Sequence, residues 1–195
     1  MKKLLVLAAA GLILGACASE KPKEHKSQDA KGMDVYANEY FSIKYPSDWE
    51  YEEEISEAND TLPVITEGIR ATFYSSNPTL PWHTVMIQKS AMPAEALATP
   101  EEWRDMSVGL KKFDDQYLGY LDEYMQDSIK FGQYPAAMAG FVVATEEGDT
   151  LVQKQTIVKV GETIYYLNNT YDWNDDGTLE SLGDSILSTI RFKGK

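Results

Sequence analysis

The sequence contains a single cysteine, Cys17, and only two histidines among its 195 residues. One cysteine excludes an intramolecular disulfide framework. His25 lies in a polar N-terminal segment, so a zinc site or a histidine-based catalytic set would depend on His83 alone. Basic residues are also scarce: 18 Lys and Arg face 31 Asp and Glu, a net charge of −13. Such a surface repels nucleic acid, and we expect no nucleic-acid partner.

Long apolar runs are nearly absent, and the longest lies at the N-terminus. Lys2 and Lys3 precede the apolar segment 4–14, which is too short to span a bilayer comfortably. A positive start followed by a short apolar stretch is the pattern of a signal peptide. No second run suggests a transmembrane helix further along the chain.

The signal-like segment ends in four consecutive residues, Leu14, Gly15, Ala16 and Cys17. They resemble the lipobox of bacterial lipoproteins, which implies cleavage before Cys17 and attachment of lipid to its thiol. Each buried acyl methylene contributes about 0.8 kcal/mol, so several chains would give lasting attachment to a membrane. By resemblance to Gram-negative sorting rules, Ala18 favours the outer membrane. An ordinary secretory signal that happens to contain a cysteine is the alternative.

We therefore expect three parts: a lipoprotein signal peptide at 1–16, a lipidated cysteine with a flexible tether at 17–32, and a globular domain at 33–195. The tether has no hydrophobic periodicity. The whole chain has 43% hydrophobic and 25% charged residues, a globular composition.

Apolar residues predict three strands before a first helix. Alternation at 41–45 is typical of a half-buried strand, and Pro46 with the following Ser and Asp predicts a turn before Trp49. Two further candidates at 69–75 and 82–90 flank a loop at 77–81.

Thr99 and Pro100 predict a helix start. Apolar residues then follow at spacings of three and four, which favours a stripe facing the core; they are Trp103, Met106, Leu110, Phe113 and Tyr117. A partner groove on this stripe is the alternative.

The second half of the chain reads as four antiparallel strands and a closing helix. The strands are expected at 122–131, 137–145, 150–160 and 162–171, the helix at 178–188 and a short strand at 189–192. We therefore predict an α+β domain with one antiparallel sheet flanked by two helices.

Three stretches together resemble the PsbP-like family. They are Tyr40–Trp49, Gly132–Ala137 and Ser185–Phe192, in the order expected for that family. The resemblance implies an α/β/α sandwich around an antiparallel sheet, used as a binding or assembly module without catalysis. The motifs determine the fold, so they assign no functional residue.

The segment 172–177 matches the first half of an EF-hand-like calcium loop. The oxygen ligands would be Asp172, Asn174, Asp176, the carbonyl of Thr178 and Glu180. Gly183 occupies the twelfth position, where a bidentate glutamate is needed, so calcium would bind weakly. An acidic turn leading into a helix explains the same residues.

Two surface features are candidates for binding. Tyr165, Tyr171 and Trp173 cluster near a strand end with asparagines, which suits carbohydrate or peptide contact or a sheet with one wet face. The acidic run 50–57 suits a basic partner or a solvated face.

The sequence favours a lipid-anchored, non-catalytic envelope protein of the outer membrane that binds a protein or glycan and needs no cofactor. The alternatives are a calcium-dependent structural lipoprotein and an envelope hydrolase. A hydrolase would show clustered carboxylates of altered pKa, or His83 in a cleft.

Overall fold

The computed structural model describes residues 32–56, 68–76, 83–90, 99–113 and 116–193. The signal peptide, the lipobox with Cys17, and the tether as far as residue 31, including His25, lie outside these ranges, as does the predicted loop at 77–81. The elements are β1 (Met33–Ala37), β2 (Phe41–Pro46), β3 (Trp49–Ser56), β4 (Gly68–Ser75), β5 (Thr84–Lys89), α1 (Pro100–Lys111), β6 (Tyr117–Phe131), β7 (Tyr134–Ala144), β8 (Thr150–Val160), β9 (Thr163–Asp172), α2 (Thr178–Ser188) and β10 (Arg191–Phe192). Within the described ranges, neither helix has the length and apolarity needed to cross a bilayer.

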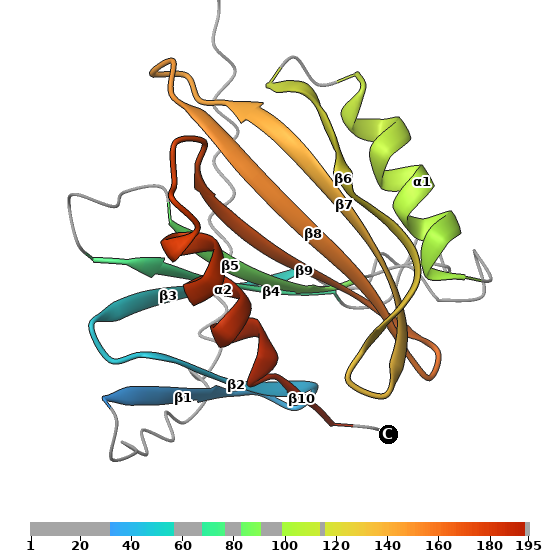
Figure 1. Ribbon diagram of the computed structural model, residues 1–195. Helices are drawn as coiled ribbons and strands as arrows, with labels where there is room; N and C mark the ends of the chain where they lie inside the picture. Colours follow the sequence, from blue (N-terminus) through green and yellow to red (C-terminus); the bar gives the residue numbers. More distant parts are fainter. Residues whose placement is uncertain (1–31, 57–67, 77–82, 91–98, 114–115, 194–195) are drawn as a thin grey trace, which may run out of the picture.

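The described strands form two antiparallel sheets (Figure 1). The large sheet has the order β3-β4-β5-β9-β8-β7-β6, and the small sheet has the order β1-β2-β10. The prediction of one sheet was therefore wrong. Pro46 ends β2 without a backbone N–H, and the turn at 47–48 leads the chain into β3 at an edge of the other sheet.

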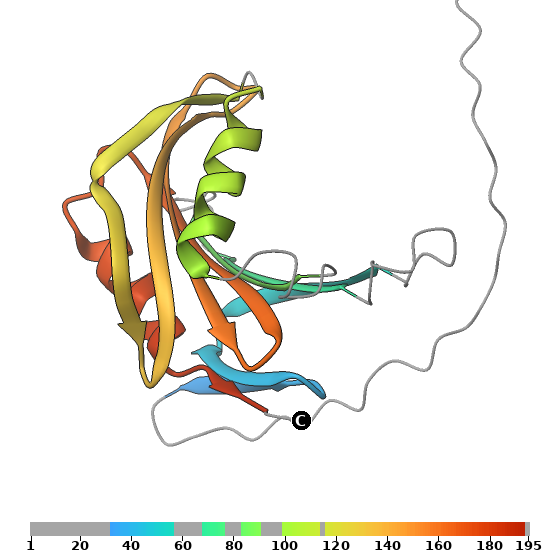
Figure 2. The same cartoon turned by 90° about the vertical axis from the view of Figure 1, so that its right-hand side faces the viewer.

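The two helices lie on opposite faces of the large sheet, as Figure 2 shows. Side chains alternate between the faces of a strand. On β8, Gln155 accepts a hydrogen bond from Ser107 of α1, whereas its neighbour Lys154 donates to Glu180 of α2. The flanking helices of the predicted sandwich are thus present, but the α2 face also carries the small sheet.

The main core lies between the large sheet and the layer made by α2 and the small sheet. Phe41 and Ile43 of β2 meet Phe73 of β4, Leu167 of β9 and Ile186 of α2, all at most 1% exposed. A smaller cluster under α1 is built on Trp103, Ile157 and Ile164. Burial of large apolar side chains on both faces holds the sheet between its covers.

Helix α1 begins as predicted, because Thr99 and Glu102 form a reciprocal capping box. The predicted core-facing stripe was correct at Trp103 (1% exposed) and wrong at its far end, since Leu110 and Phe113 are 65% and 90% exposed. The helix ends at Lys111, and its contacts with β8 run along Ser107 and Lys111, which bond to glutamines of the sheet. A polar sheet surface therefore turns the later apolar positions outward.

The acidic run at 50–57 contains most of β3, a strand that the pattern did not predict. Trp49 is buried at the start of the strand, whereas Glu54 points to solvent and pairs with Arg70 of β4 at 3.2 Å. Glu53 accepts a hydrogen bond from Tyr36, and burial raises its pKa. Charged residues on an edge strand discourage pairing with other chains.

Candidate functional site

The loop between β9 and α2 is closed by its own acidic side chains. Asp172 accepts from the backbone N–H of Asn174 at 2.6 Å, and the N–H of Asp175 donates to the carbonyl of Asp172 at 3.1 Å. The Asp175 carboxylate then accepts from the N–H groups of Gly177, Leu179 and Glu180, all at 3.0–3.1 Å. Asp175 thereby satisfies amides of the first turn of α2 and places negative charge at the positive helix end.

The residues predicted to bind calcium are distributed among other contacts. Asp176 accepts from Thr178, and these hydrogen bonds lower the pKa of Asp176. Glu180 turns away from the loop toward Lys154 and Tyr124. Among the described residues, no three His, Cys, Asp or Glu side chains gather in a metal-binding group. The structure thus gives these carboxylates helix-capping and ion-pairing roles.

A small open pocket lies beside this loop, with a volume of ≈ 180 Å³. We call it the α2 pocket; its lining residues are Leu121, Glu123, Tyr124, Val152, Tyr171, Trp173, Asp175, Gly177 and Glu180. They come from β6, β8, the end of β9, the loop and the first turn of α2. Trp173 is 47% exposed although its backbone N–H is fixed to the carbonyl of Thr150 at 3.0 Å. The pocket therefore presents a large aromatic side chain from an anchored turn.

Tyr124 reaches the pocket because Gly140 leaves room for it. A Cβ on Gly140 would lie 2.8 Å from the Cβ of Tyr124. The tyrosine ring thus lies across β7, where a larger residue would hold it off the sheet. Its hydroxyl lies 3.2 Å from the hydroxyl of Tyr171 and donates to Glu180 at 3.1 Å.

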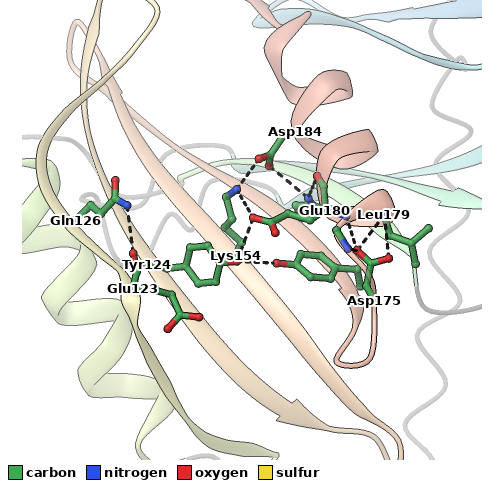
Figure 3. A network of polar contacts seen from close by, with 11 residues as sticks. Glu123, Tyr124, Gln126, Lys154, Asp175, Leu179, Glu180 and Asp184 are labelled. Carbon is green, nitrogen blue, oxygen red and sulfur yellow. Dashed lines mark hydrogen bonds and ion pairs between the residues drawn. The ribbon is translucent and has the colours of Figure 1, made fainter.

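Lys154 joins the sheet to α2 through the carboxylates of Glu180 and Asp184 (Figure 3). Its ammonium donates to Glu180 at 3.0 Å and to Asp184 at 2.5 Å, and its side chain is 12% exposed. It lies 5.5 Å from the centroid of the Tyr124 ring, a cation–π contact. One lysine therefore holds β6, β8 and α2 in a fixed arrangement around the pocket.

The environment of the pocket keeps its phenols and its ammonium protonated at neutral pH. Burial lowers the pKa of Lys154, but its bonds to Asp184 and Glu180 outweigh that effect and raise it overall. Burial is also the main reason that the pKa of Tyr171 and that of Tyr124 are raised. Neither phenol can therefore serve as a base near pH 7.

The structure brings together two of the three aromatic residues predicted to bind a ligand. Tyr171 and Trp173 line the α2 pocket. Tyr165 lies on the same face of β9 but six residues away, about 20 Å along the strand. It is 3% exposed in the main core, with its ring 4.5 Å from that of Phe192, and burial raises its pKa to about 12. Tyr165 therefore has a packing role.

His83 is 1% exposed and is not among the residues that line the α2 pocket. Its ring packs edge-on against Trp49, with centroids 4.9 Å apart. The ring approaches the side chain of Asn169 and the backbone of Leu179, but no contact of either ring nitrogen within the described residues has hydrogen-bond geometry. His83 is therefore packed in the core of the described part of the chain.

The sequence reasoning missed Tyr124, Lys154, Glu123 and Asp175. Lys154 could have been suspected, because a charged residue in the middle of a central strand must find a partner. Tyr124 carries no such signal: its position follows from irregular pairing of β6 with β7 between Leu121 and Gln126. Asp175 is the fourth residue of the segment that begins at Asp172, and the calcium-loop pattern takes its first ligands from positions 1, 3 and 5, so the pattern did not select Asp175.

Comparison with known proteins identifies the fold. No protein-family model matches the chain, and no curated protein matches it significantly. The solution structure of cyanobacterial PsbP (CyanoP) from Synechocystis sp. PCC 6803 is similar over 92% of this chain and 99% of that one, at 10% identity and a TM-score of 0.53.

Two other solved structures are similar at lower TM-scores. LpqN of Mycobacterium tuberculosis, described as involved in cell envelope biogenesis, has 14% identity, a TM-score of 0.44 and coverage of 78% of this chain and 83% of that one. A protein of Bacteroides thetaiotaomicron has 17% identity and a TM-score of 0.43; the match covers 80% of this chain but only 46% of that protein. The similarity to CyanoP establishes that the chain has a PsbP-like fold, and at 10% identity it establishes the fold alone.

Proposed function

We propose that the protein is a lipid-anchored, non-catalytic module of the bacterial cell envelope that binds an envelope component in the α2 pocket. The location rests on residues 1–17, whose positive start, short apolar segment and terminal Leu-Gly-Ala-Cys match a lipoprotein signal. Lipid on Cys17 would hold the domain at a membrane, and Ala18 favours the outer one.

The observation that carries the binding role is the exposure of Trp173 at the α2 pocket. A tryptophan that is 47% exposed on a turn closed by backbone hydrogen bonds loses little further freedom when a ligand covers it. Tyr124 and Tyr171 continue the aromatic lining inward, while Glu123 adds a carboxylate on the β6 side. Aromatic faces with a few fixed polar groups are typical of ligand sites.

Of the three carboxylates that line the pocket, the two other than Glu123 make contacts that favour binding over catalysis. Glu180 is occupied by Lys154 and Tyr124, and Asp175 caps α2 with three backbone bonds. A general base needs a free lone pair within reach of a substrate proton. His83, buried in the core, cannot provide one.

Metabolic labelling with an alkyne-bearing fatty acid tests the anchor. We expect the full-length chain to be labelled and to sediment with outer-membrane fractions after expression in a Gram-negative host. Cys17→Ala should abolish the label and release the protein into the soluble fraction. A Cys17→Ala chain that is labelled and sedimented like the wild type would contradict the anchor.

Co-sedimentation with isolated envelopes tests the pocket. A chain of residues 18–195 keeps every described contact and lacks only the signal and the cysteine. We expect it to bind envelopes saturably, and Trp173→Ala to weaken binding. Phe113→Ala is the matched control, because it also removes an exposed aromatic side chain, on α1's side of the large sheet. An equal loss of envelope binding in the two variants would indicate non-specific hydrophobic adsorption and would contradict the pocket as the binding site.

A further inference from the structure

The size of the α2 pocket limits what it can hold. At ≈ 180 Å³ it is smaller than the roughly 300–1,000 Å³ of pockets that enclose drug-sized ligands. It therefore suits one chemical group of a larger molecule, with the rest extending past Trp173 into solvent. Trp173 is an exposed aromatic member of the lining, which favours a partner that interacts with a π face.

The charges around the pocket favour a positive group. Glu123, Asp175 and Glu180 belong to its lining, and Asp172, Asp176 and Asp184 lie on the adjoining end of β9, the loop and the helix. Lys154 is the cation that the described contacts place there, and its ammonium is bound by Glu180 and Asp184. The net field at the pocket is thus negative, as is the whole chain at −13.

Glu123 is the carboxylate best placed to meet a ligand. Its backbone carbonyl accepts from the side chain of Gln126 at 3.2 Å, but no described residue pairs with its carboxylate. Asp175 and Glu180, by contrast, already accept several bonds. A cation between Trp173 and Glu123 would gain a ring face on one side and an ion pair on the other.

We propose that the α2 pocket binds an organic ammonium group, held over the ring of Trp173 and beside the carboxylate of Glu123. This inference rests on the binding role proposed above and names the chemical class of its ligand. A lysine side chain or polyamine and a choline-type headgroup share this chemistry. Attraction between a cation and the face of tryptophan is the strongest of its kind among the aromatic side chains.

A hard metal ion fits the same residues less well. Calcium requires six to eight oxygen ligands, whereas the loop carboxylates accept bonds from backbone amides and the described residues contain no metal-binding group. A metal would also leave the exposed ring of Trp173 without a role. The aromatic part of the lining thus favours an organic cation over an inorganic one.

NMR titration of the 18–195 chain tests the inference. The indole N–H resonance of Trp173, identified by its loss in Trp173→Phe, should shift on addition of tetramethylammonium or n-butylammonium chloride and stay in place with tert-butanol. Preference for tetramethylammonium would indicate a choline-type source, and preference for n-butylammonium a lysine or polyamine. Followed through the backbone amide resonances of the 172–177 loop, which every variant keeps, Trp173→Ala should weaken binding about 5- to 30-fold, and Glu123→Gln about 2- to 5-fold. Phe113→Ala should leave it unchanged.

Three outcomes would overturn the ammonium assignment. Equal shifts with tert-butanol would show an apolar subsite without charge selectivity. Shifts with calcium but not with either ammonium ion would show a metal site. The third outcome is that no probe shifts the resonance, although the wild-type chain binds envelopes and Trp173→Ala does not. This result would reject the ammonium ligand and leave the proposed function standing. If the wild-type chain binds the ammonium probes but does not bind envelopes, the proposed function is rejected and the ligand class is kept.

Discussion

Gly183 of α2 lies so close to the side chain of Asn169 on β9 that a Cβ on Gly183 would overlap the amide group. Asn169 is 0% exposed and donates to the carbonyl of Glu180 at 3.0 Å. We expect Gly183→Ala to lower the free energy of unfolding by about 1–3 kcal/mol, because the added methyl group must displace a buried, bonded amide. Urea unfolding followed by circular dichroism measures the change.

Gly109 of α1 provides the matched control for this prediction. It is also a helical glycine, but a Cβ there would meet no atom within 4 Å. Gly109→Ala should therefore raise the free energy of unfolding by about 0.5–1 kcal/mol, the usual gain of alanine in a helix. Stabilisation by both substitutions would show that α2 does not depend on close approach at Gly183.

Replacement of Lys154 by methionine should lower the free energy of unfolding by about 1–3 kcal/mol. The substitution leaves Glu180 and Asp184 facing each other without their shared cation. The loss should be smaller than the 3–5 kcal/mol typical of a fully buried pair, because the side chain of Asp184 is 44% exposed. Thermal and urea unfolding at pH 7 measure it.

A double-mutant cycle separates the ion pair from the packing of the lysine stem. Lys154→Met combined with Glu180→Gln should cost less than the sum of the single substitutions, because the second change removes a carboxylate that the first left unpaired. Strict additivity would mean that the contact between Lys154 and Glu180 contributes nothing measurable to stability.

The sequence predicted the elements that depend on local pattern. The helix start at Thr99 and the alternating strand β2 are set by neighbours a few positions apart, so short windows reveal them. In the small sheet, β2 pairs with β1, its neighbour in sequence, and also with β10 at the other end of the chain, where Ser42 lies opposite Arg191. No short-range pattern encodes that contact.

The pocket was predictable only at the residues next to the loop. Tyr171 and Trp173 stood out as aromatic residues at a strand end, and both line the pocket. Tyr165 is also an aromatic residue of the same strand, but it lies in the core, because six residues of extended chain separate it from Tyr171 at the loop. Tyr124 and Lys154 come from other strands, and only the sheet order brings them to the same place.

Asp175→Ala should lower the free energy of unfolding by about 1–2 kcal/mol, the usual range for loss of a helix cap. The carboxylate accepts from the N–H groups of Gly177, Leu179 and Glu180, which would lose this partner. If capping is the role of this loop, millimolar calcium should leave the melting temperature of the wild type unchanged. A rise in melting temperature that Asp172→Ala abolishes would instead establish the calcium site predicted from the sequence.

Stability should fall between pH 7 and pH 5 because His83 is buried in its neutral form. Burial lowers the pKa of His83 below its ordinary value of 6.5, an effect that the nearby carboxylate of Asp175 opposes only in part. Below about pH 6.5 the unfolded chain binds a proton that the folded chain excludes, so the stability present above that pH is lost as the pH falls. His83→Leu should flatten this part of the profile of unfolding free energy against pH, whereas His25→Gln, which removes the other histidine, should not. An unchanged slope in His83→Leu would mean that carboxylates cause the acid sensitivity.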